Sequence, residues 1–284
     1  MYKYIRFPGF KFKALTLSYD DGVRQDKRLI SIMKKNGLKG TFNVNGGLFS
    51  SEYKGVEKGR MTKQEALDLY LPNDMEVAIH GYKHFSLGFV EPALATYDVI
   101  EDRKELEKTF GQIIKGMAYA NGNTNDDVVD ILKKSGVSYS RTTITTEKFD
   151  IPNDWLRLPT TCHHDNPRLM ELAKQFVEMK EYYYFWGTKL QLFYLWGHSY
   201  EFDNNDNWNV IEEFAEYVGN KDDIWYATNG EIYDYLEACK QLQFSVDGSI
   251  VKNMSSTDIY INYIGKEHVI PAGKTVVLSE VNYW

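Results

Sequence analysis

Short apolar runs rich in β-branched residues alternate with amphipathic segments from about residue 14 to about residue 240. Short apolar runs are typical of buried strands, and an apolar stripe at helical spacing is typical of a helix that packs on a sheet. A regular alternation of the two predicts successive βα units joined by right-handed crossovers. We therefore expect an α/β fold, and we prefer a distorted (β/α) barrel of about seven or eight strands to an open parallel sheet.

Local patterns give the expected positions of the elements. The expected strands are 14–19, 41–44, 76–79, 114–119, 137–142, 190–195 and 224–227. The expected helices lie near 25–36, after Thr62, near 93–110, from about Asn125, after Asp165, near 208–218 and at 230–240. Thr62-x-x-Glu65 has the spacing of a capping box, which marks a helix start.

The pattern changes near the C-terminal end of the sequence. From about residue 243 it consists of short alternating strands, such as 259–263, with turns at Gly265 and at 271–273. A segment of this length buries too little surface to fold alone. We expect a barrel domain at 1–240 and a small β appendage at 241–284 that packs on it.

The composition limits the classes of partner. The net charge of -7 and the pI near 5.5 oppose binding to nucleic acid or to an anionic membrane. No apolar run approaches the roughly 20 residues of a membrane-spanning helix, and residues 1–8 lack the apolar stretch of a secretory signal. We therefore expect a cytoplasmic protein with no nucleic-acid or membrane partner, and its oligomeric state is open. Cys162 and Cys239 lie far apart and predict neither a disulfide framework nor a cysteine zinc knuckle.

Unusual polar residues follow the predicted strands at their carboxyl ends, where barrel enzymes carry their active sites. These residues are Asp20 and Asp21 after the first strand, His80 and His84 after the third, Asn121 after the fourth and His198 after 190–195. Their convergence at one end of the barrel follows from the strand assignment.

The spacing of the two histidines indicates a metal site. In His80-x-x-x-His84, one turn of helix after the strand would bring both imidazoles to the same side. Together with Asp21 they supply two nitrogen ligands and one oxygen ligand, and leave positions open as catalytic zinc sites do. Each feature also has an ordinary explanation, because Asp20 and Asp21 could cap the next helix and the histidines could be loop or core residues.

His198 follows a very apolar strand, where a titratable side chain has few structural reasons to occur. General acid catalysis is the natural role for such a residue. The alternative is a histidine whose ring is hydrogen-bonded to a backbone carbonyl.

Three ordered motifs resemble motifs one, two and five of the polysaccharide deacetylase family, also called the NodB-homology or carbohydrate esterase 4 family. They are Leu17-Ser18-Tyr19-Asp20-Asp21-Gly22, His80-x-x-x-His84 and Leu195-Trp196-Gly197-His198, and the similarity covers about residues 12 to 230. The resemblance implies a hydrolase that removes an acetyl or other acyl group from a carbohydrate, such as an N-acetylated amino sugar or oligosaccharide. It also implies a divalent metal, with zinc as first choice and cobalt or nickel as alternatives.

The same resemblance assigns roles to five residues. It makes Asp20 the catalytic base and His198 the acid, and it makes Asp21, His80 and His84 the metal ligands. The implied reaction is attack on the acyl carbonyl by a water that the metal activates, followed by protonation of the leaving amine or alkoxide.

Two motifs depart from the family pattern. Ala118-Tyr119-Ala120-Asn121-Gly122 stands where the family has Arg-x-Pro-Tyr, so the arginine that braces the base is missing, and Arg141 and Arg157 are the candidates to replace it. The Asn121 backbone N–H is the candidate oxyanion donor. Motif four is not recognisable, and we interpret Cys162-His163-His164-Asp165 as pocket wall, with His163, Asp165, Tyr119 and Trp196 as candidates to contact substrate or to support His198.

Three other functions are alternatives to a deacetylase. A small-molecule amidohydrolase would use the same chemistry. A catalytically silent glycan-binding protein would need neither Asp20 nor His198. A phosphotransferase with Asp20 as nucleophile lacks support, because the sequence has no glycine-rich phosphate loop.

Overall fold

The computed structural model describes residues 4–50, 59–181, 189–263 and 265–278. Among these, nine strands form one sheet in which every pairing is parallel. The strand order is β7-β6-β5-β4-β3-β2-β9-β8, and β10 pairs with β2. The strands are β2 (Lys13–Asp20), β3 (Gly40–Val44), β4 (Glu76–Ile79), β5 (Gly116–Ala118), β6 (Tyr139–Thr145), β7 (Leu158–Thr160), β8 (Cys162–His163), β9 (Gln191–Gly197) and β10 (Ile224–Tyr226).

One short segment connects the two ends of this strand row. Only Thr161 separates β7 from β8, and β7 pairs with β6 while β8 pairs with β9. The Thr161 N–H donates to the carbonyl of Tyr194 in β9 at 2.9 Å. Both ends of the row therefore lie next to each other, as expected of a distorted barrel. The predicted α/β class with a parallel sheet is confirmed, although β7 and β8 were not predicted.

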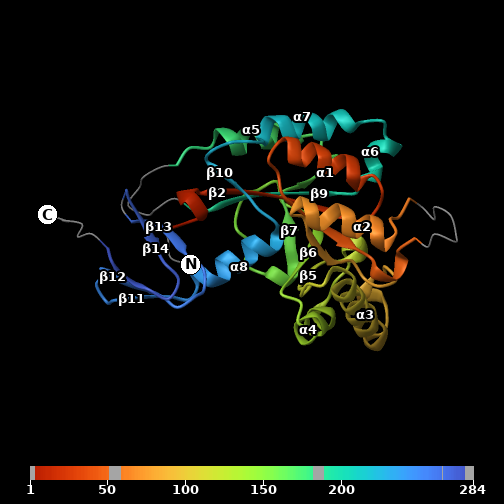
Figure 1. The fold of residues 1–284 in the computed structure, drawn as a ribbon, viewed down its shortest axis with the longest axis horizontal. Coiled ribbons are helices and arrows are strands. Elements are labelled where there is room, and N and C mark those ends of the chain that lie inside the picture. Colours follow the sequence, from red (N-terminus) through yellow and green to blue (C-terminus); the bar gives the residue numbers. More distant parts are fainter. Residues whose placement is uncertain (1–3, 51–58, 182–188, 264, 279–284) are drawn as a thin grey trace.

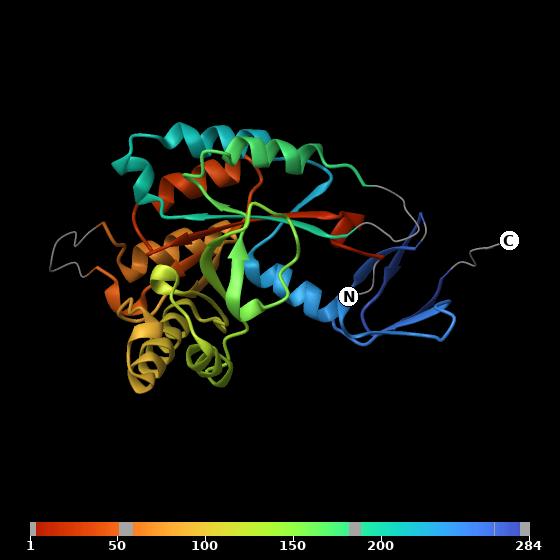
Figure 2. The ribbon, with the colours of Figure 1, turned by 180° about the vertical axis from the view of Figure 1, so that it is seen from behind.

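Helices cover the sheet in two main groups (Figures 1 and 2). Helices α1, α5 and α7 lie together on one side, and α3 and α4 lie together on another. The helices are α1 (Asp26–Lys35), α2 (Lys63–Tyr70), α3 (Pro92–Phe110), α4 (Asp126–Lys134), α5 (Leu169–Glu178), α6 (Tyr200–Asn204), α7 (Trp208–Val218) and α8 (Asn229–Cys239). Short 3-10 turns occupy Pro8–Phe10, Gly46–Leu48, Leu71–Asn73, Leu87–Phe89, Ala120–Gly122 and Trp155–Arg157.

Helix starts follow the capping signals in the sequence. The predicted capping box is confirmed, because the Thr62 side chain accepts from the Glu65 N–H and the Glu65 side chain accepts from the Thr62 N–H. The Asn125 side chain caps α4 by accepting from the Val128 N–H at 2.9 Å. Within the described ranges, none of the helices has the length and apolar character required to traverse a membrane.

Two small antiparallel sheets lie together at one end of the molecule, beside α8 (Figures 1 and 2). One consists of β1 (Ile5–Arg6), β13 (Ile259–Tyr263) and β14 (Lys266–Ile270), and the other of β11 (Leu242–Phe244), β12 (Ile250–Asn253) and β15 (Thr275–Val277). Apolar residues of these sheets and of α8 share one buried cluster. The pairing of β1 with β13 shows that an N-terminal strand completes the first of these sheets. The boundary between 1–240 and 241–284 stays a prediction.

Candidate metal and catalytic site

Asp20 is the last residue of β2, and its side chain is held inside the barrel. Arg141 of β6 donates through Nη2 to both carboxylate oxygens, and the Asn43 amide donates to Oδ1 at 2.8 Å. Burial raises the pKa of Asp20, but the charge and hydrogen bond of Arg141, together with His80 and His198, outweigh burial, and the pKa falls to about 2. Asp20 therefore stays a carboxylate at neutral pH.

Arg141 thus braces the candidate base, while Arg157 does not. Arg157 instead forms ion pairs with Asp126 and Asp154 near the surface. Of the two arginines that the sequence offered, only the one in β6 contacts Asp20, because its side chain points into the barrel.

The chain bends sharply directly after Asp20. Asp21 has φ 83° and Gly22 has φ 63°, so two consecutive residues adopt left-handed backbone conformations. Such a φ is uncommon for a residue other than glycine. Arg60 stabilises the bend by donating to the Asp21 carbonyl and, at 3.0 Å, to Asp21 Oδ1. The bend turns two neighbouring carboxylates toward the same pair of histidines.

These carboxylates face His80 and His84. The distance from Asp20 Oδ2 to His80 Nε2 is 3.7 Å, and that from Asp21 Oδ1 to His84 Nε2 is also 3.7 Å. The two imidazole rings meet edge to face, with centroids 4.8 Å apart. Four of the predicted site residues therefore converge.

His80 is buried with one ring nitrogen unused. Its Nδ1 lies 2.9 Å from the carbonyl oxygen of Ala118, which can only accept, so Nδ1 carries the proton. Its Nε2 is buried without a hydrogen-bond partner. Burial lowers the pKa of His80 and keeps the ring neutral. A neutral imidazole with a free Nε2 is the form that binds a metal ion.

The predicted helical turn between the two histidines is wrong. Residues 80–84 form an irregular loop, because Gly81 and His84 both have left-handed backbone conformations, with φ 88° and 59°. Asn45 fixes the start of the loop by donating to the carbonyls of His80 and Gly81 at 2.8 and 2.7 Å. The loop, rather than a helix, brings the two rings together.

Asp21, His80 and His84 have ligand atoms that all lie within 4.8 Å of one another. Two nitrogen donors and one carboxylate match the ligand types of catalytic zinc sites. The unpartnered Nε2 of His80 gives this set an independent reason to hold a cation, since a buried nitrogen without a partner is costly. The residues therefore fit a divalent metal.

His198 follows β9 and lies on the other side of Asp20. Its Nε2 is 3.9 Å from Asp20 Oδ2, and its Nδ1 is 3.2 Å from Glu201 Oε1. Burial lowers the pKa of His198, but the carboxylates of Glu201 and Asp20 outweigh it, so the pKa is raised. A raised pKa favours the protonated ring that a general acid needs.

Glu201 also belongs to this site, although it was not among the residues predicted from the sequence. It stands three residues after His198, within α6, and the His198 N–H also donates to its Oε2 at 3.1 Å. The spacing His198-x-x-Glu201 is that of one helical turn, so the signal was present. Glu201 lies where a residue that supports His198 was expected, and His163 and Asp165 were the predicted candidates for that role.

Trp196 packs against Arg141, the arginine that contacts the candidate base Asp20. Its ring lies 4.4 Å from Arg141 Cζ, and its centroid is 4.6 Å from that of His163. A cation over an aromatic face is attracted to it, so Trp196 helps to fix Arg141. A contact with substrate stays a prediction for Trp196.

Tyr119 and Asn121 lie just beyond β5. The Tyr119 side chain is buried, and its hydroxyl donates to the Leu156 carbonyl at 2.7 Å. The Asn121 side chain is exposed and donates to Ser86 Oγ at 2.8 Å, and its backbone is left-handed with φ 58°. The oxyanion role of Asn121 and the substrate role of Tyr119 stay predictions.

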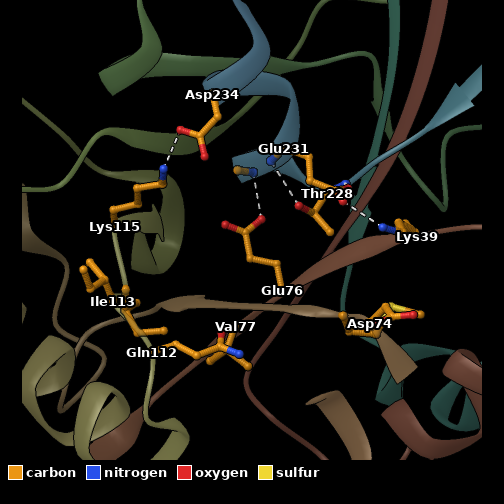
Figure 3. Close-up of a pocket in the computed structure, with 13 residues that line it drawn as sticks. Lys39, Asp74, Glu76, Val77, Gln112, Ile113, Lys115, Thr228, Glu231 and Asp234 are labelled. Carbon is orange, nitrogen blue, oxygen red and sulfur yellow. Dashed lines mark hydrogen bonds and ion pairs between the residues drawn. The ribbon is translucent and has the colours of Figure 1, made fainter. Parts of the chain in front are cut away.

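A pocket of about 310 Å³ lies at the opposite, amino-terminal end of the strands (Figure 3). Glu76 at the start of β4 lies in its middle and accepts hydrogen bonds from the Gly230 N–H and the Thr41 and Tyr139 hydroxyls. Lysines at its rim pair with Glu231 and Asp234. Glu76 and these two lysines are paired within the protein, and the pocket is separate from Asp20 and the histidines.

Comparison with known proteins gives a family for part of the chain. Residues 9–140 match the family model described as polysaccharide deacetylase. This match includes Asp20, Asp21, His80 and His84, whereas His198 lies beyond it. No curated protein gives a significant match to the sequence.

Several solved structures resemble the chain. A putative polysaccharide deacetylase from Mycobacterium smegmatis has 16% identity over 84% of this chain and 94% of its own, with a TM-score of 0.57. A mutant of a Bacillus anthracis pseudoenzyme of the carbohydrate esterase 4 family, with restored enzymatic activity, has 15% identity over 81% of this chain and 70% of its own, with a TM-score of 0.50. The Streptococcus pyogenes deacetylase PplD, solved with acetate, has 22% identity over 45% of this chain and 55% of its own, with a TM-score of 0.41.

At these identities the first two structures support the fold alone. The family match is independent of them and contains the motifs with the two aspartates and two histidines. The resemblance seen in the sequence is thereby confirmed over residues 9–140, which match the polysaccharide deacetylase family model.

Proposed function

We propose that this protein is a metal-dependent hydrolase that removes an acetyl group from a carbohydrate, such as an N-acetylated amino sugar or oligosaccharide. The observation that carries the proposal is the buried, unpartnered Nε2 of His80, which faces an ionised Asp20. A neutral nitrogen ligand, a carboxylate base and a protonated histidine around one point are the parts that hydrolysis of an amide or ester requires.

Asp21, His80 and His84 are the residues that would hold the metal. A divalent ion there, with zinc as first choice and cobalt or nickel as alternatives, supplies a Lewis acid for the acyl carbonyl and lowers the pKa of water.

Asp20 acts as the base in this proposal. Arg141 and Asn43 fix the orientation of its carboxylate, so the lone pairs that remain are aimed in a defined direction. A carboxylate with a pKa of about 2 is a weak base. We therefore infer that Asp20 mainly orients the attacking water and accepts its proton as the bond to the acyl carbon forms.

His198 acts as the acid. It donates a proton from Nε2, the nitrogen that faces Asp20, to the leaving amine or alkoxide, while the Glu201 carboxylate lies 3.2 Å from Nδ1. The Asn121 N–H is our candidate to bind the developing oxyanion, since a backbone donor needs no particular side chain.

Release of acetate from acetylated chito-oligosaccharides tests the proposal. We expect release with added zinc or cobalt and little release after chelation, and we expect Asp20→Asn to lose about a hundredfold or more of kcat. Asp130→Asn, at an exposed ion pair on α4, is the matched control and should keep full activity.

Other outcomes separate the alternatives. Release from small acyl amides but from no acetylated saccharide would favour an amidohydrolase of the same chemistry. Binding of oligosaccharide without release from any acylated substrate would favour a silent glycan-binding protein. Full activity in Asp20→Asn would refute the assignment of the base.

A further inference from the structure

A second group of metal-ligating side chains lies beside His198. It consists of His163, His164, Asp165 and Glu201, whose ligand atoms all lie within 4.8 Å of one another. The first three come from the end of β8 and the turn after it, and Glu201 comes from α6. Five of the six histidines in the sequence thus belong either to this group or to the candidate catalytic site. The group shares no residue with the set Asp21, His80 and His84.

Three distances within this group are close to those between ligands of one ion. His164 Nε2 lies 3.2 Å from Glu201 Oε2 and 3.3 Å from Asp165 Oδ1. His163 Nε2 lies 3.2 Å from the same oxygen of Glu201. In a tetrahedral zinc site with bonds of about 2.0–2.2 Å, neighbouring ligand atoms are roughly 3.3–3.6 Å apart.

His164 provides independent evidence. Its side chain is fully buried, yet neither ring nitrogen has a hydrogen-bond partner. The ring packs against Phe202, with centroids 4.2 Å apart, and stacks on Tyr19 at 5.8 Å. A buried histidine with only a structural role uses its N–H on a carbonyl or carboxylate in good geometry. This ring instead turns Nε2 toward two carboxylate oxygens.

The backbone makes room for this ring. A Cβ atom on Gly197 would lie 2.1 Å from His164 Nδ1. Gly197 belongs to the motif that precedes His198, so the strand that positions the candidate acid also gives space to His164. The charges fit as well, since two carboxylates close together attract a divalent cation.

We propose that His164, Asp165 and Glu201, with His163 as fourth ligand, bind a second divalent transition-metal ion, for which zinc is the probe of choice. His163 is the weakest ligand of the four. Its Nδ1 accepts the Asp165 N–H at 3.2 Å, and this bond must break if Nε2 is to coordinate a metal as a neutral ring.

The second site is linked to the candidate acid through Glu201. Oε2 of Glu201 faces the two histidines of the group, and Oε1 faces His198 Nδ1 at 3.2 Å. A bound ion would fix the orientation of this carboxylate, which in turn holds His198. The second ion therefore positions the acid and does not contact the substrate.

The stoichiometry of zinc tests the proposal. Metal-free protein is incubated with excess zinc, separated from unbound metal and analysed by mass spectrometry. We expect two equivalents in the wild type, one in His164→Gln, one in His80→Gln and a smaller loss in His163→Gln. His268→Gln, at the remaining histidine in β14, is the matched control and should retain two.

His164 is buried, so its variant could fail to fold for other reasons. Asp165→Asn, in a turn with a side chain 42% exposed, is the second variant, and it should also bind one equivalent with an unchanged circular dichroism spectrum.

The outcomes distinguish the two sites. One equivalent in the wild type that disappears only in His80→Gln overturns the second site and leaves the proposed catalytic metal intact. One equivalent that disappears only in His164→Gln or Asp165→Asn supports the second site and overturns the first. Two equivalents in both of these last variants also overturn the second site.

Discussion

Arg141 donates to both carboxylate oxygens of Asp20 across the inside of the barrel, from a strand that does not neighbour the strand of Asp20. Both side chains are almost fully buried. The family pattern places an arginine at the end of β5, where this chain has Ala118. The positive charge beside the candidate base Asp20 therefore comes from β6 here.

Arg141→Leu should destabilise the protein by about 3–5 kcal/mol, because it leaves a buried carboxylate without its cation. Urea denaturation measures this change in the free energy of unfolding. Arg157→Leu removes a partly exposed arginine with ion pairs of its own and should cost under about 1 kcal/mol. Equal decreases in the free energy of unfolding for the two variants would show that the buried pair of Arg141 with Asp20 stabilises the fold no more than a surface pair does.

Gly81→Ala should displace the loop that carries the two histidines. At Gly81, φ is 88° and a Cβ atom would lie 2.4 Å from Asp98 Oδ2. Gly111→Ala is a matched control, because Gly111 has φ 65° but nothing within 4 Å of its added Cβ. The control should lose about 1–2 kcal/mol from backbone strain alone.

Gly81→Ala should lower the free energy of unfolding more than the control does, and its affinity for zinc at the first site should fall. Thermal unfolding and competition with a chromophoric chelator measure the two effects. Identical stabilities and affinities for the two variants would mean that the close contact with Asp98 is relieved without moving His80 or His84.

Glu201→Gln should lower kcat about tenfold to a hundredfold and leave KM nearly unchanged, since Glu201 orients His198 and is not placed to bind substrate. Asp206→Asn, at an exposed residue just after α6, is the control and should keep both constants. A rise in KM with an unchanged kcat would instead indicate that Glu201 contacts the substrate. Steady-state kinetics on the best acetylated substrate separates these results.

Asp26 gives the stability a specific pH dependence. Its carboxylate is buried and accepts from the hydroxyls of Tyr70 at 2.6 Å and Ser199 at 2.5 Å. Burial raises its pKa to about 7, well above the usual range of an aspartate, despite these two bonds, and the negative charge of Asp21 adds to the rise.

Asp26→Asn should remove this dependence. Below about pH 4 both the folded and the unfolded states hold the proton, so this group does not lower the free energy of unfolding. Between about pH 4 and 7 the unfolded state loses the proton and the folded state keeps it, so stability falls as pH rises, by up to roughly 4 kcal/mol in total.

Thermal unfolding from pH 4 to 8 measures this effect. The stability of Asp26→Asn relative to the wild type should increase across that window and then level off. A constant difference would show that the pKa of Asp26 is not raised, and Asp130→Asn, with an exposed side chain, should show no such trend.

Local signals predicted most helices and strands, because periodicity and capping are written in neighbouring residues. The strands β7 and β8 were not predicted because both are very short, β7 contains Pro159, and each is stabilised by pairing with another strand, β6 or β9. The loop at 80–84 was misassigned as helical, because a spacing of four residues does not reveal that Gly81 and His84 turn left-handed.

In the candidate site, too, some features follow from local sequence and others depend on contacts between distant residues. The strand ends predicted which polar residues converge, since parallel strands end at one side of the barrel. The choice between Arg141 and Arg157 depended on which side chain points inward, and that is a property of the register of β6. Glu201 could have been found from its spacing to His198, whereas its contacts with His163 and His164 depend on how the turn after β8 meets α6.

The pairing of Ile5 with Ile261 has a consequence for the synthesis of this protein. A ribosome releases β1 first, and β13 follows only after all the barrel strands, which lie between the two in the sequence. Until then the exposed edge of β1 has no native strand to bind, and an unpaired strand edge is a site for aggregation. The barrel strands are complete before β13 is made, so the β1–β13–β14 sheet is expected to close after the barrel has begun to fold.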